Sequence, residues 1–68
     1  MMKTKKLRFH RDGYDYVATT NETEYCISKS FGAWRVWVND EKQDEFFDYI
    51  ADAKEWCQNH CNNLVKEA

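Results

Sequence analysis

The sequence predicts a small α+β domain in which an antiparallel sheet packs on one C-terminal helix. Three observations predict this class: a length of only 68 residues, apolar residues with a period of two in the first part of the chain, and a period of 3.6 near its end. We expect three or four strands within about residues 6–39 and a helix over about residues 48–66. Elements with one apolar side each must bury those sides against each other.

The length and composition favour one compact domain. A chain of this size buries only about 60% of the surface that its unfolded form exposes, so its core needs large side chains. Aromatic residues make up 16% of the sequence and charged residues 32%, a composition typical of a globular domain and not of a disordered one. We therefore expect a single domain over residues 1–68, with residues 1–5 flexible.

The strand prediction rests on four segments separated by turn signals. Each segment either alternates apolar and polar residues or is rich in β-branched and aromatic residues. The segments are LRFHR (7–11), YDYVATT (14–20), EYCISKS (24–30) and WRVWVN (34–39). Asp12-Gly13, which follows the first segment, is a dipeptide suited to a tight hairpin turn.

Strand alternation divides these residues between a face that the helix covers and an open face. The residues expected against the helix are Leu7, Phe9, Tyr16, Ile27, Trp34, Val36 and Val38, with Phe46 or Phe47 closing the edge. The residues expected on the open face are Arg8, His10, Asp15, Val17, Cys26, Ser28, Arg35 and Trp37. For the second strand, the sequence does not decide which residues face the helix, because Tyr16 and Val17 both suit a core.

The helix prediction rests on a hydrophobic stripe. The residues of this stripe are Ile50, Ala53, Cys57, Cys61 and Leu64. Asp48 is a good N-cap, and Asp52 adds negative charge to the first turn, where the helix dipole favours it.

Cys57, His60 and Cys61 form the one group in the chain that resembles a chemical site. Zinc needs three or four converging ligands, and Cys26 on a strand is the only further cysteine. The favoured interpretation is core packing, because Cys57 and Cys61 lie in the middle of the stripe and free cysteine is among the most buried residue types. A zinc site, redox chemistry and a cysteine–histidine nucleophile are the alternatives. We expect no cofactor and no enzymatic activity.

The C-terminal half carries a recognisable pattern: RVW (35–37), then Phe47-Asp48, then Ala53, Lys54 and Trp56. This pattern resembles the AP2 DNA-binding domain and is similar to the N-terminal arm-binding domains of phage-type integrases. It also looks like small phage and prophage accessory proteins, which often end in a helix of this pattern. The resemblance implies a three-stranded sheet backed by one helix, with the open sheet face as the binding surface.

Trp37 and Arg35 are the residues that we expect to bind a partner, because Trp and Arg are enriched at binding hot spots. Lys6, Arg8 and His10 extend this predicted patch. The alternative is that Trp37 lies beneath the N-terminal segment or packs at a sheet edge.

Two classes of function remain. The first is a non-catalytic module that binds a protein, such as a small phage-type accessory or inhibitor protein acting on a host or defence-system protein. The second is a DNA- or RNA-binding sheet domain. The net charge of −2 favours the protein partner, and the basic residues 3–11 favour nucleic acid. Self-association through the sheet is a third outcome. No apolar run has the length of a membrane span, so we expect a cytoplasmic protein.

Overall fold

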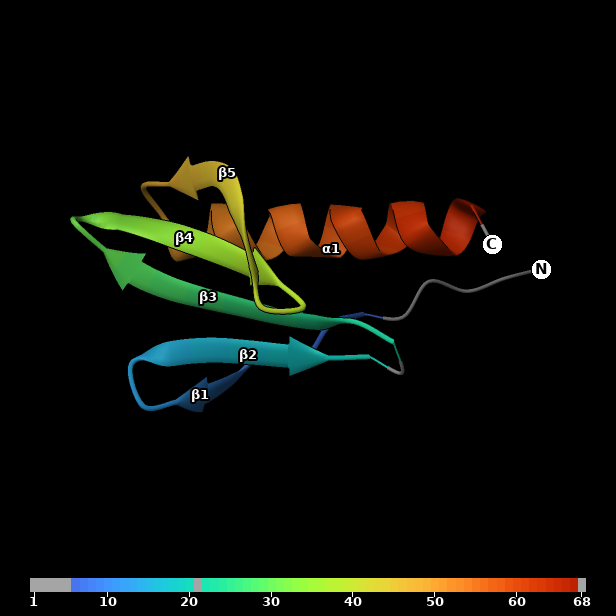
Figure 1. The fold of residues 1–68 in the computed structure, drawn as a ribbon, viewed down its shortest axis with the longest axis horizontal. Coiled ribbons are helices and arrows are strands. Elements are labelled where there is room, and N and C mark those ends of the chain that lie inside the picture. Colours follow the sequence, from blue (N-terminus) through green and yellow to red (C-terminus); the bar gives the residue numbers. More distant parts are fainter. Residues whose placement is uncertain (1–5, 21, 68) are drawn as a thin grey trace.

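The computed structural model describes residues 6–20 and 22–67, and the side chains up to residue 63. It confirms the α+β class: an open antiparallel sheet packs on one C-terminal helix (Figure 1). The elements are β1 (His10–Asp12), β2 (Asp15–Thr19), β3 (Glu24–Ser30), β4 (Ala33–Val38), β5 (Glu41–Phe47) and α1 (Ile50–Glu67). No helix in the described ranges is both long and apolar enough to cross a membrane.

The strands form a simple meander in which each strand pairs with the next along the chain. Two-residue turns close three of the hairpins, since Asp12 pairs with Asp15, Ser30 with Ala33, and Val38 with Glu41. Positive φ angles mark these turns, as two-residue hairpins require. The register therefore fixes which side chains share a face, because a slip of one residue would move every side chain to the other face.

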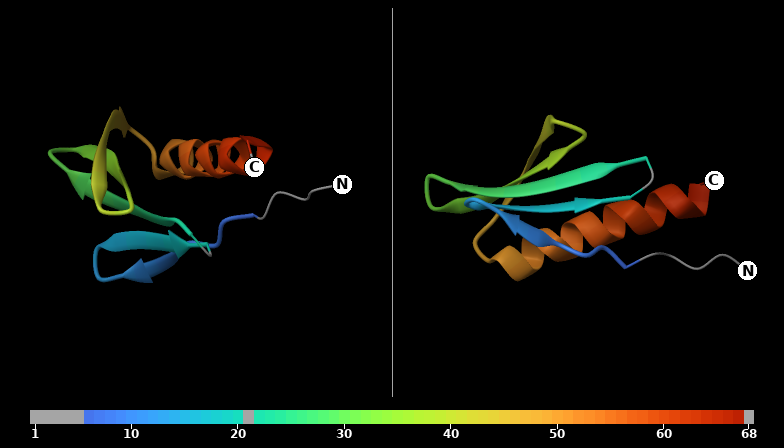
Figure 2. Two further views of the ribbon diagram at one scale, coloured as in Figure 1. Left: turned by 45° about the vertical axis from the view of Figure 1, so that its right-hand side comes forward. Right: turned by 90° about the horizontal axis from the view of Figure 1, so that it is seen from below.

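The helix covers one face of the sheet and leaves the other open (Figure 2). It begins at Ile50, and the carbonyl of Tyr49 accepts a hydrogen bond from the Ala53 amide at 3.3 Å. Tyr49 thus holds the N-cap position, and the expectation that Asp48 does so is wrong by one residue. Asp52 lies in the first turn, as predicted.

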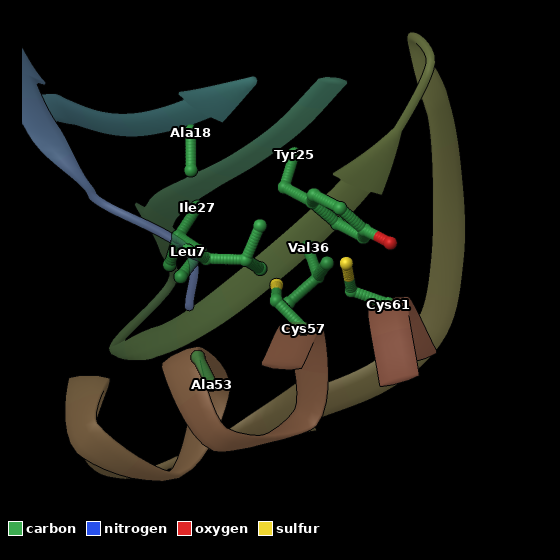
Figure 3. Packing of buried hydrophobic residues seen from close by; sticks show 8 residues of the cluster. All are labelled: Leu7, Ala18, Tyr25, Ile27, Val36, Ala53, Cys57 and Cys61. Carbon is green, nitrogen blue, oxygen red and sulfur yellow. The ribbon is translucent and has the colours of Figure 1, made fainter. Parts of the chain in front are cut away.

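The core lies between α1 and the inner strands, and it confirms most of the predicted helix-facing set (Figure 3). Its buried members are Leu7, Ala18, Tyr25, Ile27, Val36, Ala53, Cys57 and Cys61. Partly buried side chains pack around them: Phe9, Tyr16, Trp34, Val38, Phe47, Ile50 and Trp56. Tyr16 pairs with Ile27, which places Tyr16 on the covered face and Val17 on the open one. The side chain of Leu64 lies outside the described part.

The sheet has one strand more than the range of about 6–39 allows, because β5 continues it to Phe47. Most of β5 is polar and exposed, so its sequence lacks the alternation that identifies the other strands. Its pairing with β4 is irregular. The two-residue step from Arg35 to Trp37 stands against the four-residue step from Phe46 to Lys42. Such a bulge bends a strand and disrupts its ladder.

The N-terminal segment leaves the sheet before β1 begins. The Leu7 amide donates a 2.8 Å hydrogen bond to Oε1 of Gln58 on the helix, and Phe9 packs against the core. The predicted strand over 7–11 is therefore shortened to His10–Asp12, because residues 7–9 close the side of the core and do not pair with β2. The expectation that residues 1–5 are flexible lies outside the described residues.

Candidate functional site

The open face of the sheet is defined here as the face opposite α1. One row of paired residues crosses all five strands of this face, and we call it the central row. Its members are His10, Val17, Cys26, Trp37 and Lys42. Val17, Cys26 and Trp37 are partly buried, whereas the two ends of the row, His10 and Lys42, are exposed. The row therefore has an apolar middle and a basic or titratable group at each edge.

A second row lies next to the central row, towards the β3–β4 turn. Ser28 pairs with Arg35, and Arg35 pairs with Phe46. The Arg35 guanidinium carbon lies 5.0 Å from the centre of the Phe46 ring, within the range of a cation–π contact. Phe46 is still 54% exposed, so this pair offers both a cation and an aromatic surface to a partner.

Trp37 differs from the other two tryptophans in its surroundings. Trp34 meets Tyr16 edge-on at 5.9 Å, and Trp56 stacks on His60 at 5.3 Å. Trp37 has no ring stacking and no cation–π contact with any residue that the structure describes. Its neighbours across the strands are the small Cys26 and the exposed Lys42. The large indole is therefore only partly covered, on a face that no helix protects.

The predicted partner-binding residues do not all lie together. Arg35 and Trp37 share β4 and the open face, as expected. His10 belongs to the same row but stands three strands from Trp37, roughly 14 Å away at about 4.8 Å per strand. Lys6 and Arg8 precede β1 and line a shallow hollow with Leu7, Thr19 and Thr20 at the end of β2.

The cysteines of the helix belong to the core, as the favoured interpretation predicts. Cys57 is fully buried and Cys61 is 6% exposed, and both point into the cluster of Figure 3. Cys26 lies on the opposite face of the sheet, paired with Trp37. Among the residues that the structure describes, no group of three or more His, Cys, Asp or Glu side chains converges on a metal position.

The geometry and the thiol pKa also argue against a cysteine–histidine nucleophile. Burial raises the pKa of Cys57 to about 12, so the reactive thiolate is scarce at neutral pH. His60 is already engaged, since its Nδ1 lies 2.9 Å from the hydroxyl of Tyr25. With a neutral imidazole protonated at Nε2, this hydroxyl donates the bond.

Tyr25 anchors this buried group. Its ring is fully buried, and its edge meets the His60 ring at 5.6 Å. Burial, helped by the neighbouring thiols Cys61 and Cys57, raises the pKa of Tyr25 to about 12. A buried hydroxyl with a partner costs little, whereas the same hydroxyl without one would be expensive. Tyr25 and His60 therefore have a clear structural role: they satisfy each other beneath the covered face.

Sequence reasoning missed Phe46 and Lys42 as members of the open face. Their positions depend on β5, which the prediction did not contain. One signal was available: Asn39-Asp40 follows a strong strand, and Asn and Asp tolerate the positive φ of a hairpin turn. A hairpin at that point would have placed the next residues against β4.

The fold and the site together define a class: a small α+β domain with an uncovered sheet face that carries aromatic, cationic and apolar side chains. Comparison of the chain with protein-family models, with curated proteins and with solved structures gives no match. The function is therefore argued from the chemistry of the open face.

Proposed function

We propose that this protein is a non-catalytic binding module that grips another protein with its open sheet face. Trp37 is the observation that carries the proposal, because its large ring lies on an uncovered face and has no aromatic or cationic partner in the described part of the chain. Arg35 and Phe46 extend the same surface by one row. Tryptophan and arginine at the centre of a contact, surrounded by smaller side chains, match the composition of a hot spot.

The charges on the open face support a protein partner over nucleic acid. The central row and its neighbour carry Arg35, Lys42 and His10, but Asp15 and Glu24 stand on the same face. A sheet that binds nucleic acid needs a basic groove along the backbone path as well as rings for stacking. Lys6 and Arg8, which would supply more positive charge, line the hollow at the end of β2 instead.

The finer identification is part of the same proposal: a small phage-type accessory or inhibitor protein that occupies a host or defence-system protein. It rests on the F-D-x-x-x-x-A-K-x-W pattern, which in this chain runs from Phe47 to Trp56. The fold explains most of that pattern, since Phe47, Ala53 and Trp56 pack in or against the core. The pattern thus supports the sheet-and-helix arrangement, and the open face supplies the binding chemistry.

The test is capture of a partner by the immobilised protein, with Trp37→Ala and Asp40→Gly run side by side. Asp40 lies in the β4–β5 turn, outside the proposed surface. Loss of a hot-spot aromatic costs about 2 kcal/mol or more, so Trp37→Ala should weaken binding of the captured protein about thirtyfold or more. Asp40→Gly should bind like the parent chain.

The same protein should be tried in a mobility-shift assay with single- and double-stranded DNA and RNA at low salt. Phosphate contacts release counterions, so nucleic-acid binding would fall steeply as salt is raised. Micromolar binding with that salt dependence, lost in Trp37→Ala, would replace the protein-binding proposal with a nucleic-acid one. Capture that is equally strong with Trp37→Ala would show that the open face is not the interface.

A further inference from the structure

The two ends of the sheet carry different kinds of turn. The β1–β2 turn, the β3–β4 turn and the connection between β5 and α1 all lie at one end, at the left of Figure 1. Each of these turns presents an aromatic ring to solvent: Tyr14 is 89% exposed, Phe31 is 100% exposed and Tyr49 is 71% exposed. We call these three residues the aromatic end. The turns at the other end, 20–23 and 39–40, contain only polar residues.

Phe31 is in a backbone conformation that does not suit it. The two residues of the β3–β4 turn have φ angles of 53° at Phe31 and 78° at Gly32, a turn that favours Asn, Asp or Gly at both positions. The left-handed conformation is unfavourable for a bulky residue, because it brings Cβ too close to the following carbonyl oxygen. The β4–β5 turn at the polar end has the same signs of φ, at Asn39 and Asp40, and uses residues that tolerate them. A fully exposed phenylalanine at a strained position gains nothing for the fold itself.

The side chains of the polar end hydrogen-bond to backbone groups at the same end, whereas the rings of the aromatic end have no comparable contacts among the described residues. Thr20 Oγ1 accepts a 3.0 Å hydrogen bond from the Thr23 amide, and Asn39 Oδ1 accepts a 2.8 Å bond from the Glu24 amide. The rings of the aromatic end have no stacking or cation–π contact within the ranges that the structure describes. Exposed apolar groups that gather at one end of a small domain mark an interaction site.

Charge indicates the chemistry of the partner. Four carboxylates flank the aromatic end, and none has an ion-pair partner in the described part of the chain. They are Asp12, Asp15, Asp48 and Asp52. The cations of this region lie over rings instead: Arg11 over Tyr16 at 5.2 Å, Lys54 over Tyr16 at 5.1 Å and Lys29 over Trp34 at 5.6 Å. The surface therefore combines exposed aromatic rings with carboxylates that no cation pairs in the described part of the chain.

We propose that the aromatic end is a second docking surface, which binds an extended segment rich in Lys and Arg from a partner protein. Cations of such a segment can lie over the exposed rings while their charge meets the flanking carboxylates. The tips that carry Tyr14 and Phe31 are two strand spacings apart, roughly 10 Å along the sheet. An extended peptide covers that distance with about three residues, so cations on alternate residues can reach both rings.

The probe is a synthetic ten-residue peptide in which Lys and Arg alternate with Leu, titrated into the ¹⁵N-labelled protein. Amide shifts should concentrate at residues 13–14, 31–32 and 48–49 and be absent at 22–23 and 39–40. A matched peptide with Glu in place of each Lys and Arg should cause no shifts. Binding should weaken several-fold when salt is raised from low to moderate concentration, because the charges involved are exposed.

Phe31→Asn is the decisive variant, because two readouts should move in opposite directions. Asn suits the left-handed turn, so the melting temperature should rise, while the affinity for the cationic peptide should fall about tenfold or more. Asp40→Gly relieves the same conformation at the polar end, so it should raise the melting temperature and leave the affinity unchanged. Trp37→Ala should also leave it unchanged, which separates this surface from the open face.

Three results would overturn the proposal. The first is unchanged peptide affinity in Phe31→Asn. The second is binding of the parent protein to phosphatidylcholine–phosphatidylglycerol vesicles that Phe31→Asn abolishes, without peptide binding, since the tips would then enter a lipid interface. The third is a concentration-dependent dimer in sedimentation that Phe31→Asn converts to monomer, since a second copy would then occupy the tips.

Discussion

The two faces of the sheet are built from the same strands and serve opposite needs. Val36 and Trp37 are neighbours in β4, yet Val36 is fully buried under the helix and Trp37 stands on the open face. On the covered face, the aromatic rings have partners: Tyr25 has His60, and Trp34 has Tyr16. On the open face, Trp37 has none among the described residues. For finding a binding residue, the exposed fraction of an aromatic side chain is therefore less informative than whether its ring already has a partner within the protein.

The largest effect on stability should come from removing a buried side chain of the covered face. Tyr25→Ala removes a fully buried ring and leaves His60 without its hydroxyl partner, so we expect a loss of about 3–5 kcal/mol in the free energy of unfolding. Domains of this length have a total stability of about 3–10 kcal/mol, so the variant should be largely unfolded. Circular dichroism during urea unfolding measures this.

Tyr25→Phe is the matched control, because it keeps the ring and removes only the hydroxyl. It should cost about 1–3 kcal/mol, since Nδ1 of His60 loses its partner. Equal costs for the two variants would mean that the ring contributes nothing, and the account of the covered face would be wrong.

The next largest effect should be a loss of folding stability at alkaline pH. The pKa of Cys57 rises from 9.0 to about 12, and that of Tyr25 from 10.0 to about 12, both chiefly because of burial. Between these values the unfolded chain has released protons that the folded chain still holds. Stability is therefore fully present below about pH 9 and falls as pH rises towards about 12.

Chemical denaturation from pH 8 upwards checks this dependence on pH. Cys57→Ala should remove part of the slope and leave the rest, because Tyr25 and the partly exposed Cys26, whose pKa burial also raises, are still present. A stability that stays constant from pH 8 to pH 11 would contradict the burial of both groups.

A smaller effect separates the thiols of the two faces. Cys26 is partly exposed beside Trp37, whereas Cys57 is fully buried, so iodoacetamide should modify Cys26 about tenfold faster or more in the folded protein. Mass spectrometry of the digested protein measures the rates. A captured partner should slow modification of Cys26 and leave that of Cys57 unchanged. Faster modification of Cys57 would reverse the assignment of the two faces.

The smallest effect belongs to the Arg35–Phe46 pair. Phe46 is 54% exposed and Arg35 is only partly buried, so the coupling energy of the pair in a double-mutant cycle should be about 0.5–1 kcal/mol. The cycle uses Arg35→Ala, Phe46→Ala and the double variant in urea unfolding. A coupling above about 2 kcal/mol would mean that the open face is packed like a core.

The covered face could be predicted from the sequence because its residues follow from the spacing of apolar side chains within single strands and within the helix. Ile27 and Val36 follow from strand alternation, and Ala53 and Cys57 follow from helical spacing, so the α+β class and most of the core are correct. Tyr25 could also have been found, because it stands two residues from Ile27 in the same strand. A tyrosine suits either face of a sheet, and the partner that allows its burial, His60, is 35 residues away.

The open face could be predicted only in part, because β5, the edge strand beside β4, has no strand signature in its sequence. EKQDEFF is mostly charged, and only its pairing with β4 makes it a strand. The choice between Phe46 and Phe47 therefore stayed open, and the register answers it: Phe47 pairs with Trp34 on the covered face and Phe46 with Arg35 on the open one. Arg35 and Trp37 were placed correctly since β4 alternates clearly.

The exposed rings of the aromatic end could not be predicted from the sequence for a different reason. In the sequence, Phe31-Gly32 is only an interruption between the segments 24–30 and 34–39, and nothing in composition distinguishes an exposed phenylalanine from a buried one. Only the positive φ at Phe31 and its complete exposure set it apart. Sequence rules predict where a residue suits the fold, and Phe31 is a residue that does not suit its turn.

The central claim is that the open face binds and the covered face holds the fold together, and the adjacent pair Val36 and Trp37 tests it most directly. For Val36→Ala and Trp37→Ala, the free energy of unfolding and the affinity for the captured partner should be measured on the same preparations. We predict that Val36→Ala loses about 2–3 kcal/mol of stability and keeps its affinity once the folded fraction is taken into account. Trp37→Ala should lose less than about 1 kcal/mol of stability and about thirtyfold or more in affinity. A Trp37→Ala protein that unfolds readily and binds normally would contradict the account.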